Sequence, residues 1–209
     1  MSTQVSRPKT TTLVEWGVAV RAHPGESECG DRHVVRAFPD GVLLAVVDGL
    51  GHGQKAAAAA RVAATVLEEH AGEEPRILVE RCHEALAGSR GVVMSLASMD
   101  RKGSLSWLGV GNVEAVLVRP ADGHARREER LLLRGGVVGF QLPALRAASL
   151  RVEPGDVLGL ATDGVRSAFA TSLALDRAPQ QLADEVLAEH GQTGDDALVL
   201  VARFVGAQP

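Results

Sequence analysis

The sequence predicts an α+β domain with mainly antiparallel sheet. Short apolar segments with the two-residue period of strands occupy much of the chain. Two helical stretches follow one another directly in the first half, and a third precedes the last strand. Strands and helices therefore do not alternate one by one, as they would in a parallel α/β sheet.

The chain is expected to form one domain behind a short tail. Residues 1–12 are polar, which predicts a flexible N-terminal tail, and residues 13–209 contain neither a linker nor a repeat. A chain of 209 residues can bury a sizeable core. We therefore expect a single domain over residues 13–209.

Apolar spacing predicts the elements of the first half. They are a strand at 13–21, a loop at 23–31, strands at 34–38 and 42–47 joined by a turn, and helices at 54–70 and 75–88. The first helix has apolar residues at helical spacing, which we expect to face the core: Ala59, Val62, Ala63, Val66 and Leu67. Pro75 is a residue favoured in a first helical turn, so the second helix begins there.

The second half is predicted in the same way. It contains strands at 92–99, 105–109 and 114–119, a turn at 120–123, a strand-like segment at 131–133, strands at 145–152 and 157–161, a helix at 179–190 and a strand at 197–205. The strands at 145–152 and 157–161 are expected to pair with each other. Residues 167–177 show no period and are predicted to be irregular.

Composition excludes several classes of function. A net charge of −4, an aromatic content of 3% and the lack of tyrosine argue against a nucleic-acid partner. Cys29 and Cys82 are too few for a disulfide framework or a zinc motif. No apolar run reaches the ~18 residues of a membrane span, and residues 1–12 lack the apolar core of a signal peptide. We expect a cytoplasmic protein without a membrane or nucleic-acid partner.

The most informative stretch is residues 43–53. A buried strand ends in Asp48-Gly49, and Gly51 and Gly53 follow immediately before a helix. Asp-Gly also favours a tight hairpin turn, but a hairpin needs a second strand where this chain has a helix. An aspartate at a strand end, followed by glycines whose backbone no side chain covers, suits a metal or phosphate site.

Four aspartates share this kind of position at the ends of predicted strands. Asp31 precedes the strand that pairs with the one ending in Asp48, so the two are predicted neighbours. Asp163 follows an apolar strand, and Asp195, with Asp196 beside it, precedes the last one. Any one of them alone would be interpreted as a turn cap. Together they predict a site for hard divalent cations such as Mg²⁺ or Mn²⁺, because converging carboxylates repel one another unless cations neutralise them.

At this point the chain resembles a known family, the metal-dependent Ser/Thr protein phosphatases of the 2C type, and within it the bacterial sporulation and stress-response branch. The resemblance is carried by motifs in family order: Cys29-Gly-Asp31, Ala45-Val-Val-Asp-Gly-Leu-Gly51, Glu80-Arg-Cys-His83, Arg90-Gly91, Gly109-Val-Gly-Asn-Val113, Thr162-Asp-Gly164 and Asp195-Asp196. These motifs run from about residue 25 to the end of the sequence, nearly the whole chain.

The resemblance implies an α-β-β-α sandwich with two metal ions, Mn²⁺ or Mg²⁺, at one edge. It assigns Asp48, the Gly49 carbonyl, Asp163, Asp195 and Asp31 as metal ligands, and it places Asp196 and Asn112 around them. The metals would activate a water for in-line attack on a phosphoserine or phosphothreonine. Larger relatives carry a general-acid histidine where this chain has Leu50, and His52 is the candidate to assist the leaving group instead.

The resemblance further implies a monomeric enzyme acting on a phosphorylated stress-signalling protein. A short flap is expected beside the metals at residues 166–179. Two alternatives stay open: a catalytically degenerate phosphatase fold that serves as a binding module, and a phosphohydrolase acting on a small molecule. Cys29 and Cys82 have no role in this chemistry and are expected to be small buried side chains.

Overall fold

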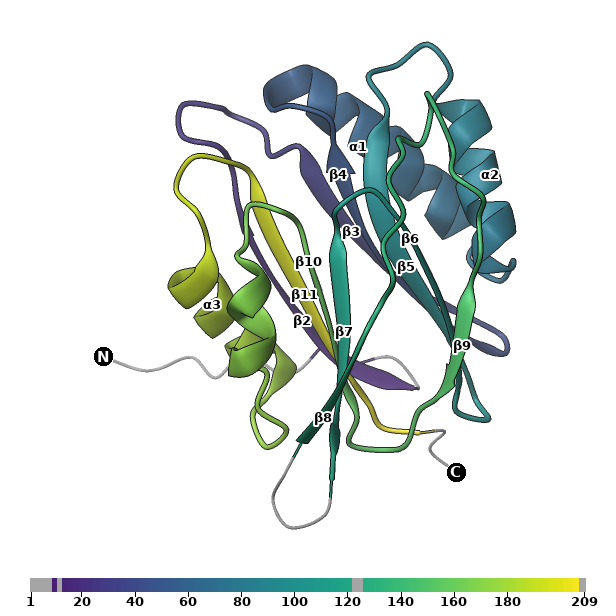
Figure 1. Ribbon diagram of the computed structural model, residues 1–209, viewed down its shortest axis with the longest axis vertical. Coiled ribbons are helices and arrows are strands. Elements are labelled where there is room, and N and C mark those ends of the chain that lie inside the picture. The colour runs from purple at the N-terminus through teal and green to yellow at the C-terminus, as the bar shows by residue number, and fades with distance from the viewer. Residues whose placement is uncertain (1–8, 11–12, 122–125, 207–209) are drawn as a thin grey trace.

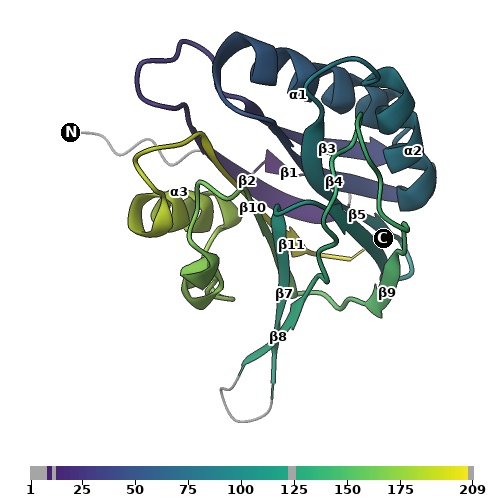
Figure 2. The same cartoon turned by 45° about the horizontal axis from the view of Figure 1, so that its top comes forward.

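Two antiparallel sheets pack face to face and carry helices on their outer faces, as Figures 1 and 2 show. The computed structural model describes residues 9–10, 13–121 and 126–206. Helices α1 (Gly53–Glu69) and α2 (Pro75–Ala85) cover one sheet. Helix α3 (Pro179–His190) and the short 3-10 helix η2 (Ser167–Ser172) cover the other. The predicted α-β-β-α sandwich is confirmed.

The six-stranded sheet joins the first and last long strands of the chain. Its order is β1-β2-β11-β10-β7-β8, and every pair of neighbours is antiparallel. The strands are β1 (Lys9–Thr10), β2 (Val14–Arg21), β7 (Glu114–Pro120), β8 (Arg126–Arg130), β10 (Val157–Ala161) and β11 (Ala197–Phe204). β2 pairs with β11 along its whole length.

The five-stranded sheet uses the middle of the chain. Its order is β3-β4-β5-β6-β9, again with antiparallel neighbours. The strands are β3 (Asp31–Phe38), β4 (Gly41–Gly49), β5 (Val92–Asp100), β6 (Ser104–Val110) and β9 (Ala148–Arg151). β4 lies between β3 and β5, so both of its edges are paired.

β4 is buried on both faces, which explains why its sequence is continuously apolar rather than alternating. Val42, Leu44 and Val46 face the other sheet, whereas Leu43, Ala45 and Val47 face α1 and α2. All residues from 41 to 47 are buried. The prediction of a fully buried strand at 42–47 is confirmed, and the helix layer on its outer face is the reason.

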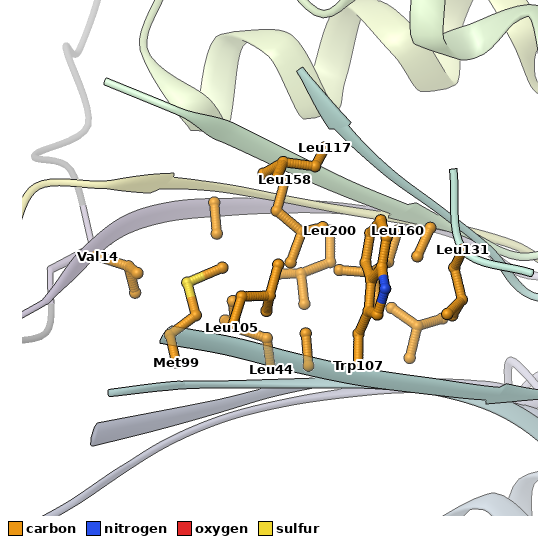
Figure 3. Close-up of a cluster of buried hydrophobic side chains, with 14 of the residues drawn as sticks. Val14, Leu44, Met99, Leu105, Trp107, Leu117, Leu131, Leu158, Leu160 and Leu200 are labelled. Carbon is orange, nitrogen blue, oxygen red and sulfur yellow. The ribbon is translucent and has the colours of Figure 1, made fainter. Parts of the chain in front are cut away.

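The space between the sheets is filled by the core shown in Figure 3. Leu44, Met99, Leu105 and Trp107 come from the five-stranded sheet, and Leu117, Leu158, Leu160 and Leu200 come from the six-stranded one. All are buried. This core fixes the two sheets relative to each other, and with them the positions of their strand ends.

Helix α1 packs closely on its sheet through alanine. Ala59, Ala63 and Leu67 are buried, as predicted. Val62 was predicted to face the core as well, and that prediction is wrong, because the side chain is 41% exposed. Helical spacing alone places Val62 on the face of the helix that packs on the sheet. The alanines bring the helix so near the sheet that this buried face is narrow and leaves Val62 outside it.

The predicted pairing of residues 145–152 with 157–161 is also wrong. β9 pairs with β6 in the five-stranded sheet, whereas β10 pairs with β7 and β11 in the other sheet. β9 is an edge strand with three exposed residues of four, and β10 is buried throughout. The turn between them therefore crosses from one sheet to the other.

The region after β7 departs from the prediction as well. Residues 131–133 were expected to be strand-like, but the strand is β8, just before them. β8 is a charged edge strand with no apolar alternation, so its sequence gives no strand signal. Cross-strand ion pairs such as Arg130–Glu114 hold it against β7. Of the predicted turn at 120–123, Pro120 is the last residue of β7, and residues 122 and 123 lie outside the described residues.

Two further predictions concern the N-terminal tail and the lack of a membrane span. Within the predicted tail, Lys9 and Thr10 form β1 opposite Trp16 and Glu15, and residues 1–8 and 11–12 lie outside the described part of the chain. None of the helices among the described residues combines the length and apolar character that a membrane crossing requires.

The contact between β2 and α3 leads to a stability prediction. A Cβ on Gly17 would lie 2.2 Å from the Cα of Gln180, whose side-chain amide also binds the backbone of Val18. We expect Gly17→Ala to lower the free energy of unfolding by about 1–3 kcal/mol, because α3 must move away from the sheet. Urea unfolding measures this, with Gly194→Ala as the control, since nothing lies within 4 Å of a Cβ there. Equal stability of Gly17→Ala and the unchanged protein would contradict this close approach.

Candidate active site

The predicted acidic positions meet at one edge of the sandwich. Asp31 opens β3 and lies opposite Asp48 near the end of β4, as their positions in a hairpin predicted. Asp163 follows β10, and Asp195 precedes β11, the antiparallel neighbour of β10. Figure 1 shows the loops after β2, β10 and α3 gathered at the upper end of the molecule. The five-stranded sheet thus supplies one pair of carboxylates and the six-stranded sheet the other.

These side chains line a single cleft of about 720 Å³. Its lining contains every side chain proposed from the sequence as a ligand or a neighbour of the metals: Asp31, Asp48, Asn112, Asp163, Asp195 and Asp196, with His52 at the same cleft. It contains no lysine or arginine. The carboxylates therefore have no positively charged side chain of the cleft wall to neutralise them.

Asp31 is the most buried of the set, with 2% of its surface exposed. Its Oδ2 accepts a 2.8 Å hydrogen bond from the Thr162 hydroxyl, which in turn accepts one from the backbone N–H of Leu198. Burial raises the pKa of Asp31 to about 7, although the Thr162 bond opposes the rise. Thr162 was predicted only as part of a motif. The structure shows that it links Asp31 to β10, which it follows directly, and to β11, through Leu198.

Asp48 is the most strongly perturbed group. Burial, followed by the charges of Asp31, Asp163 and Asp195, raises the pKa of Asp48 to about 9. Such an environment favours either a proton or a cation on the carboxylate. Because the charged oxygens around it are carboxylates and no cysteine lines the cleft, the donor set fits a hard divalent cation.

Asp163 and Asp195 form the more exposed side of the cleft. Asp163 Oδ2 accepts a 2.7 Å bond from Asn112 Nδ2, which agrees with the expectation that Asn112 supports the acidic cluster. Burial and the charge of Asp195 raise the pKa of Asp163. Asp195 Oδ1 accepts the backbone N–H of Asp196. Both carboxylates are thus oriented by hydrogen bonds at the mouth of the cleft.

Asp196 has a different task. It is buried, and its two oxygens accept the backbone N–H groups of His23, at 2.7 Å, and of Gly30, at 2.9 Å. It therefore fastens both ends of the loop between β2 and β3 to the start of β11. Both oxygens of Asp196 are thus engaged by backbone groups, and its place beside the metal ligands stays a prediction.

His52 belongs to a cluster that sequence reasoning did not find. Its Nδ1 lies 2.7 Å from Glu26 Oε1, and its ring stacks on that of His23 with centroids 4.3 Å apart and planes 10° apart. His23 and His52 both line the cleft. The Glu26 contact occupies Nδ1 and leaves Nε2 of His52 as the nitrogen available for other partners. Residues 23–31 carried only a loop signal in the sequence, so nothing there indicated this pairing.

Gly49 is buried beside Asp48 and does not line the cleft. A Cβ there would lie 2.2 Å from the carbonyl oxygen of Ala56, so the start of α1 packs directly on this residue. In the described residues, no three Asp, Glu, His or Cys side chains stand close enough to hold a metal ion as they are. Two of the carboxylates are instead hydrogen-bonded to neighbouring side chains, Asp31 to Thr162 and Asp163 to Asn112.

Neither cysteine has the properties of a nucleophile. Burial raises the pKa of Cys82 to about 12, and burial raises that of Cys29 to about 12 as well, with further contributions from Asp31 and Asp196. Cys82 is fully buried, whereas Cys29 is only half-buried. Both remain thiols near neutral pH, in agreement with the expectation that neither takes part in chemistry.

The expected flap at residues 166–179 does not border the cleft. Its 3-10 helix η2 packs on the outer face of the six-stranded sheet, with Phe169 fully buried there. The segment after β8 borders the cleft instead, through Gly135 and Val137. Val138 in this segment pairs with Val92 at the start of β5. The flap prediction is therefore wrong, because this segment packs on the outer face of the sheet and not beside the acidic cluster.

Comparisons with known proteins agree with this architecture. A relative, the phosphoserine phosphatase RsbX of Bacillus subtilis (strain 168), is 31% identical over 98 residues, which are 46% of this chain and 49% of the relative. The match thus spans about half the length of that protein. A solved structure of RsbX in complex with magnesium is 21% identical, with a TM-score of 0.83, and the match covers 95% of this chain and 98% of that one.

A second solved structure comes from work on the bacterial stressosome, described as a modular system adapted to control secondary messenger signalling. Its chain is 30% identical, with a TM-score of 0.83, and the match covers 91% of this chain and 99% of that one. The sandwich has the PP2C phosphatase fold, as in the solved PP2C phosphatase domain of SpoIIE from Bacillus subtilis, which is 21% identical with a TM-score of 0.72 over 94% of this chain and 64% of that one. The chain belongs to the SpoIIE family, because the family model described as Stage II sporulation protein E (SpoIIE) matches residues 39–205.

The buried carboxylates predict a pH dependence of stability in the absence of metal. The pKa of Asp48 is about 9 in the folded protein, against 3.8 for an unperturbed carboxyl, so the folded state holds a proton that the unfolded state has lost. The free energy of unfolding is therefore expected to fall as the pH rises from about 4 to about 9. Asp31 acts in the same direction up to about pH 7.

Urea unfolding in EDTA at several pH values measures this fall. The variant Asp48→Asn should lose much of the slope, because the amide does not titrate, and saturating Mg²⁺ should reduce the slope in the unchanged protein. A slope identical in Asp48→Asn would contradict the assignment to Asp48.

Proposed function

We propose that this chain is a divalent-metal-dependent phosphatase that hydrolyses phosphoserine or phosphothreonine on a bacterial stress-signalling protein. The observation that carries the proposal is the cleft in which carboxylates from both sheets meet without a lysine or arginine among the lining residues. Membership of the SpoIIE family supports the same function. So does the likeness to a phosphoserine phosphatase and to a structure containing magnesium.

The proposed ligands are Asp31, Asp48, Asp163 and Asp195, with the backbone carbonyl of Gly49. Two Mn²⁺ or Mg²⁺ ions, when bound, would supply Lewis-acid activation of water for in-line attack on phosphorus. The protein contributes a fixed frame: Thr162 orients Asp31, Asn112 orients Asp163, and Asp196 anchors the neighbouring loop. Isothermal titration with each cation, in the unchanged protein and in Asp163→Asn, gives the number of ions and the preferred metal.

The proposed role of His52 is to protonate the leaving oxygen of the serine or threonine. Glu26 holds Nδ1, the stacked His23 ring fixes the plane of the imidazole, and both histidines line the cleft. With Nδ1 held by the carboxylate, Nε2 is the nitrogen that would deliver a proton to an alkoxide leaving group. Glu26 acts as a positioning residue in this arrangement.

The proposed partner is a phosphorylated stress-signalling protein, of the stressosome-scaffold or anti-sigma-antagonist kind, met by a monomer in the cytoplasm. The names of the two relatives, a phosphoserine phosphatase and a stressosome structure, support this choice. A degenerate binding module is disfavoured, because carboxylates that raise one another's pKa have no use in a passive scaffold. A small-molecule enzyme is disfavoured because the cleft has no phenylalanine, tyrosine or tryptophan in its lining to grip a base or ring.

The central test is hydrolysis of a phosphoserine protein by the purified chain with Mn²⁺ or Mg²⁺. Activity should appear with metal and vanish in EDTA. Asp48→Asn should reduce kcat/KM by at least about 100-fold, because one ligand and its charge are lost. The same variant should be as stable as the unchanged protein or more so in EDTA, since it removes a repelling carboxylate. A large loss of stability in EDTA would identify Asp48 as a structural cap instead.

The role of His52 is tested by comparing leaving groups. His52→Gln should lower kcat on a phosphoserine substrate by about 100-fold, because a serine alkoxide needs a proton as it leaves. It should affect p-nitrophenyl phosphate far less, because nitrophenolate leaves without one. Glu26→Gln should show a smaller effect of the same kind and shift the alkaline limb of the pH–rate profile, because a general acid stops acting once it has lost its proton. An equal loss on both substrates in His52→Gln would mean that His52 only shapes the loop.

A further inference from the structure

A second groove lies beside the cleft along the exposed face of α1. It has a volume of about 460 Å³ and is lined by Lys55, Ala58 and Val62 of α1, with Ser89 and Arg90 of the turn before β5. We name it the α1 groove. Its floor is apolar, and Val62, the residue that helical spacing wrongly assigned to the core, is 41% exposed there.

The α1 groove and the cleft share a wall. Leu50 lines the cleft, its backbone N–H donates to Gly91, and its carbonyl accepts a 3.5 Å bond from Arg90. Gly51 has Arg90 as its nearest neighbour on the groove side, since a Cβ there would lie 2.8 Å from Arg90 Nη1. A chain leaving the cleft over residues 50–52 would therefore enter the groove directly.

The groove and the cleft carry opposite charges. Lys55 and Arg90 are both exposed, and neither forms an ion pair with any carboxylate in the described part of the chain. Other exposed arginines of the described residues do form such pairs: Arg61 pairs with Glu28, and Arg76 with Glu80. Two unpaired cations over a small apolar floor form a surface that complements a peptide with acidic side chains.

From these observations we propose that the α1 groove binds an acidic stretch of the phosphoprotein substrate, next to the phosphoresidue in the cleft. The proposal rests on the proposed phosphatase function and adds what the enzyme recognises around the phosphate. From Gly53 to Val62 the helix rises by about 14 Å at ~1.5 Å per residue. An extended peptide covers that length with about four residues at ~3.3 Å each, so the acidic side chains belong within about four positions of the phosphoresidue.

The test uses three synthetic phosphoserine peptides of equal length. Two carry aspartates within four residues before or after the phosphoserine, and the third carries lysines at the same positions. We expect one of the aspartate peptides to have the highest kcat/KM, by at least about 10-fold over the lysine peptide, with the difference shrinking as salt is added. Without the groove, the acidic cleft and the net charge of −4 favour the lysine peptide, so its preference would overturn the proposal.

The matched variants are Lys55→Glu/Arg90→Glu and Lys102→Glu/Arg101→Glu. Lys102 and Arg101 are also exposed, Arg101 also donates to one backbone carbonyl, and both lie at the far end of β5 from the cleft. The two double variants change the net charge equally. The first should abolish or reverse the preference for aspartate, and the second should keep it. Ala58→Trp, which fills the groove without changing its charge, should also weaken the preference.

Binding separates this proposal from the phosphatase activity. Fluorescence anisotropy with a labelled aspartate peptide that carries no phosphate needs no turnover. Its Kd should be at least about 10-fold weaker for Lys55→Glu/Arg90→Glu than for Lys102→Glu/Arg101→Glu. Equal affinities would overturn the docking proposal even if the enzyme is active. Failure of the unchanged protein to hydrolyse any phosphate ester would overturn the phosphatase function and leave the binding result to decide on the groove.

Discussion

Repulsion among carboxylates at the sheet edge is the constraint on which the rest of the structure depends. Asp48 cannot relieve it by moving, because β4 is paired on both edges and buried on both faces. Asp31 is tied to Asp48 by register and to the other sheet through Thr162. The apolar core between the sheets therefore holds together charges that would separate in a looser structure. A divalent cation is the natural partner of such an edge, since it converts the repulsion into attraction.

The hairpin predicted from the sequence was enough to place Asp31 beside Asp48, because a short turn between two strands fixes which of their residues lie opposite each other. The meeting of that pair with Asp163 and Asp195 was predicted from their shared position at strand ends, whereas the stacking of two separate sheets that brings them together came from the family resemblance. Periodicity also failed for Val62, where the closeness of the alanine face to the sheet decides what is buried. That distance is a tertiary property and leaves no local signal.

Charged and irregular segments were the least predictable. β8 has no apolar pattern and is a strand because β7 offers it an open edge and matching charges. The partnership of Glu26, His52 and His23 joins a loop to the residue before a helix, so no spacing rule reports it. A flap beside the cleft was expected at residues 166–179, but a 3-10 helix buries Phe169 on the outer face of the six-stranded sheet. In each case the surrounding structure, and not the local sequence pattern, determined the outcome.

The pairing of β2 with β11 has a consequence for the order of folding. The five-stranded sheet needs only residues 31–151, so Asp31 and Asp48 can take their places while later residues are still being synthesised. The six-stranded sheet needs β11 at its centre, and its ladder with β2 joins residues more than 170 positions apart. Asp163 and Asp195 therefore reach the other two carboxylates only when the six-stranded sheet forms and the core between the sheets closes. The mutual repulsion of the four carboxylates thus arises only when the two sheets that hold them have formed.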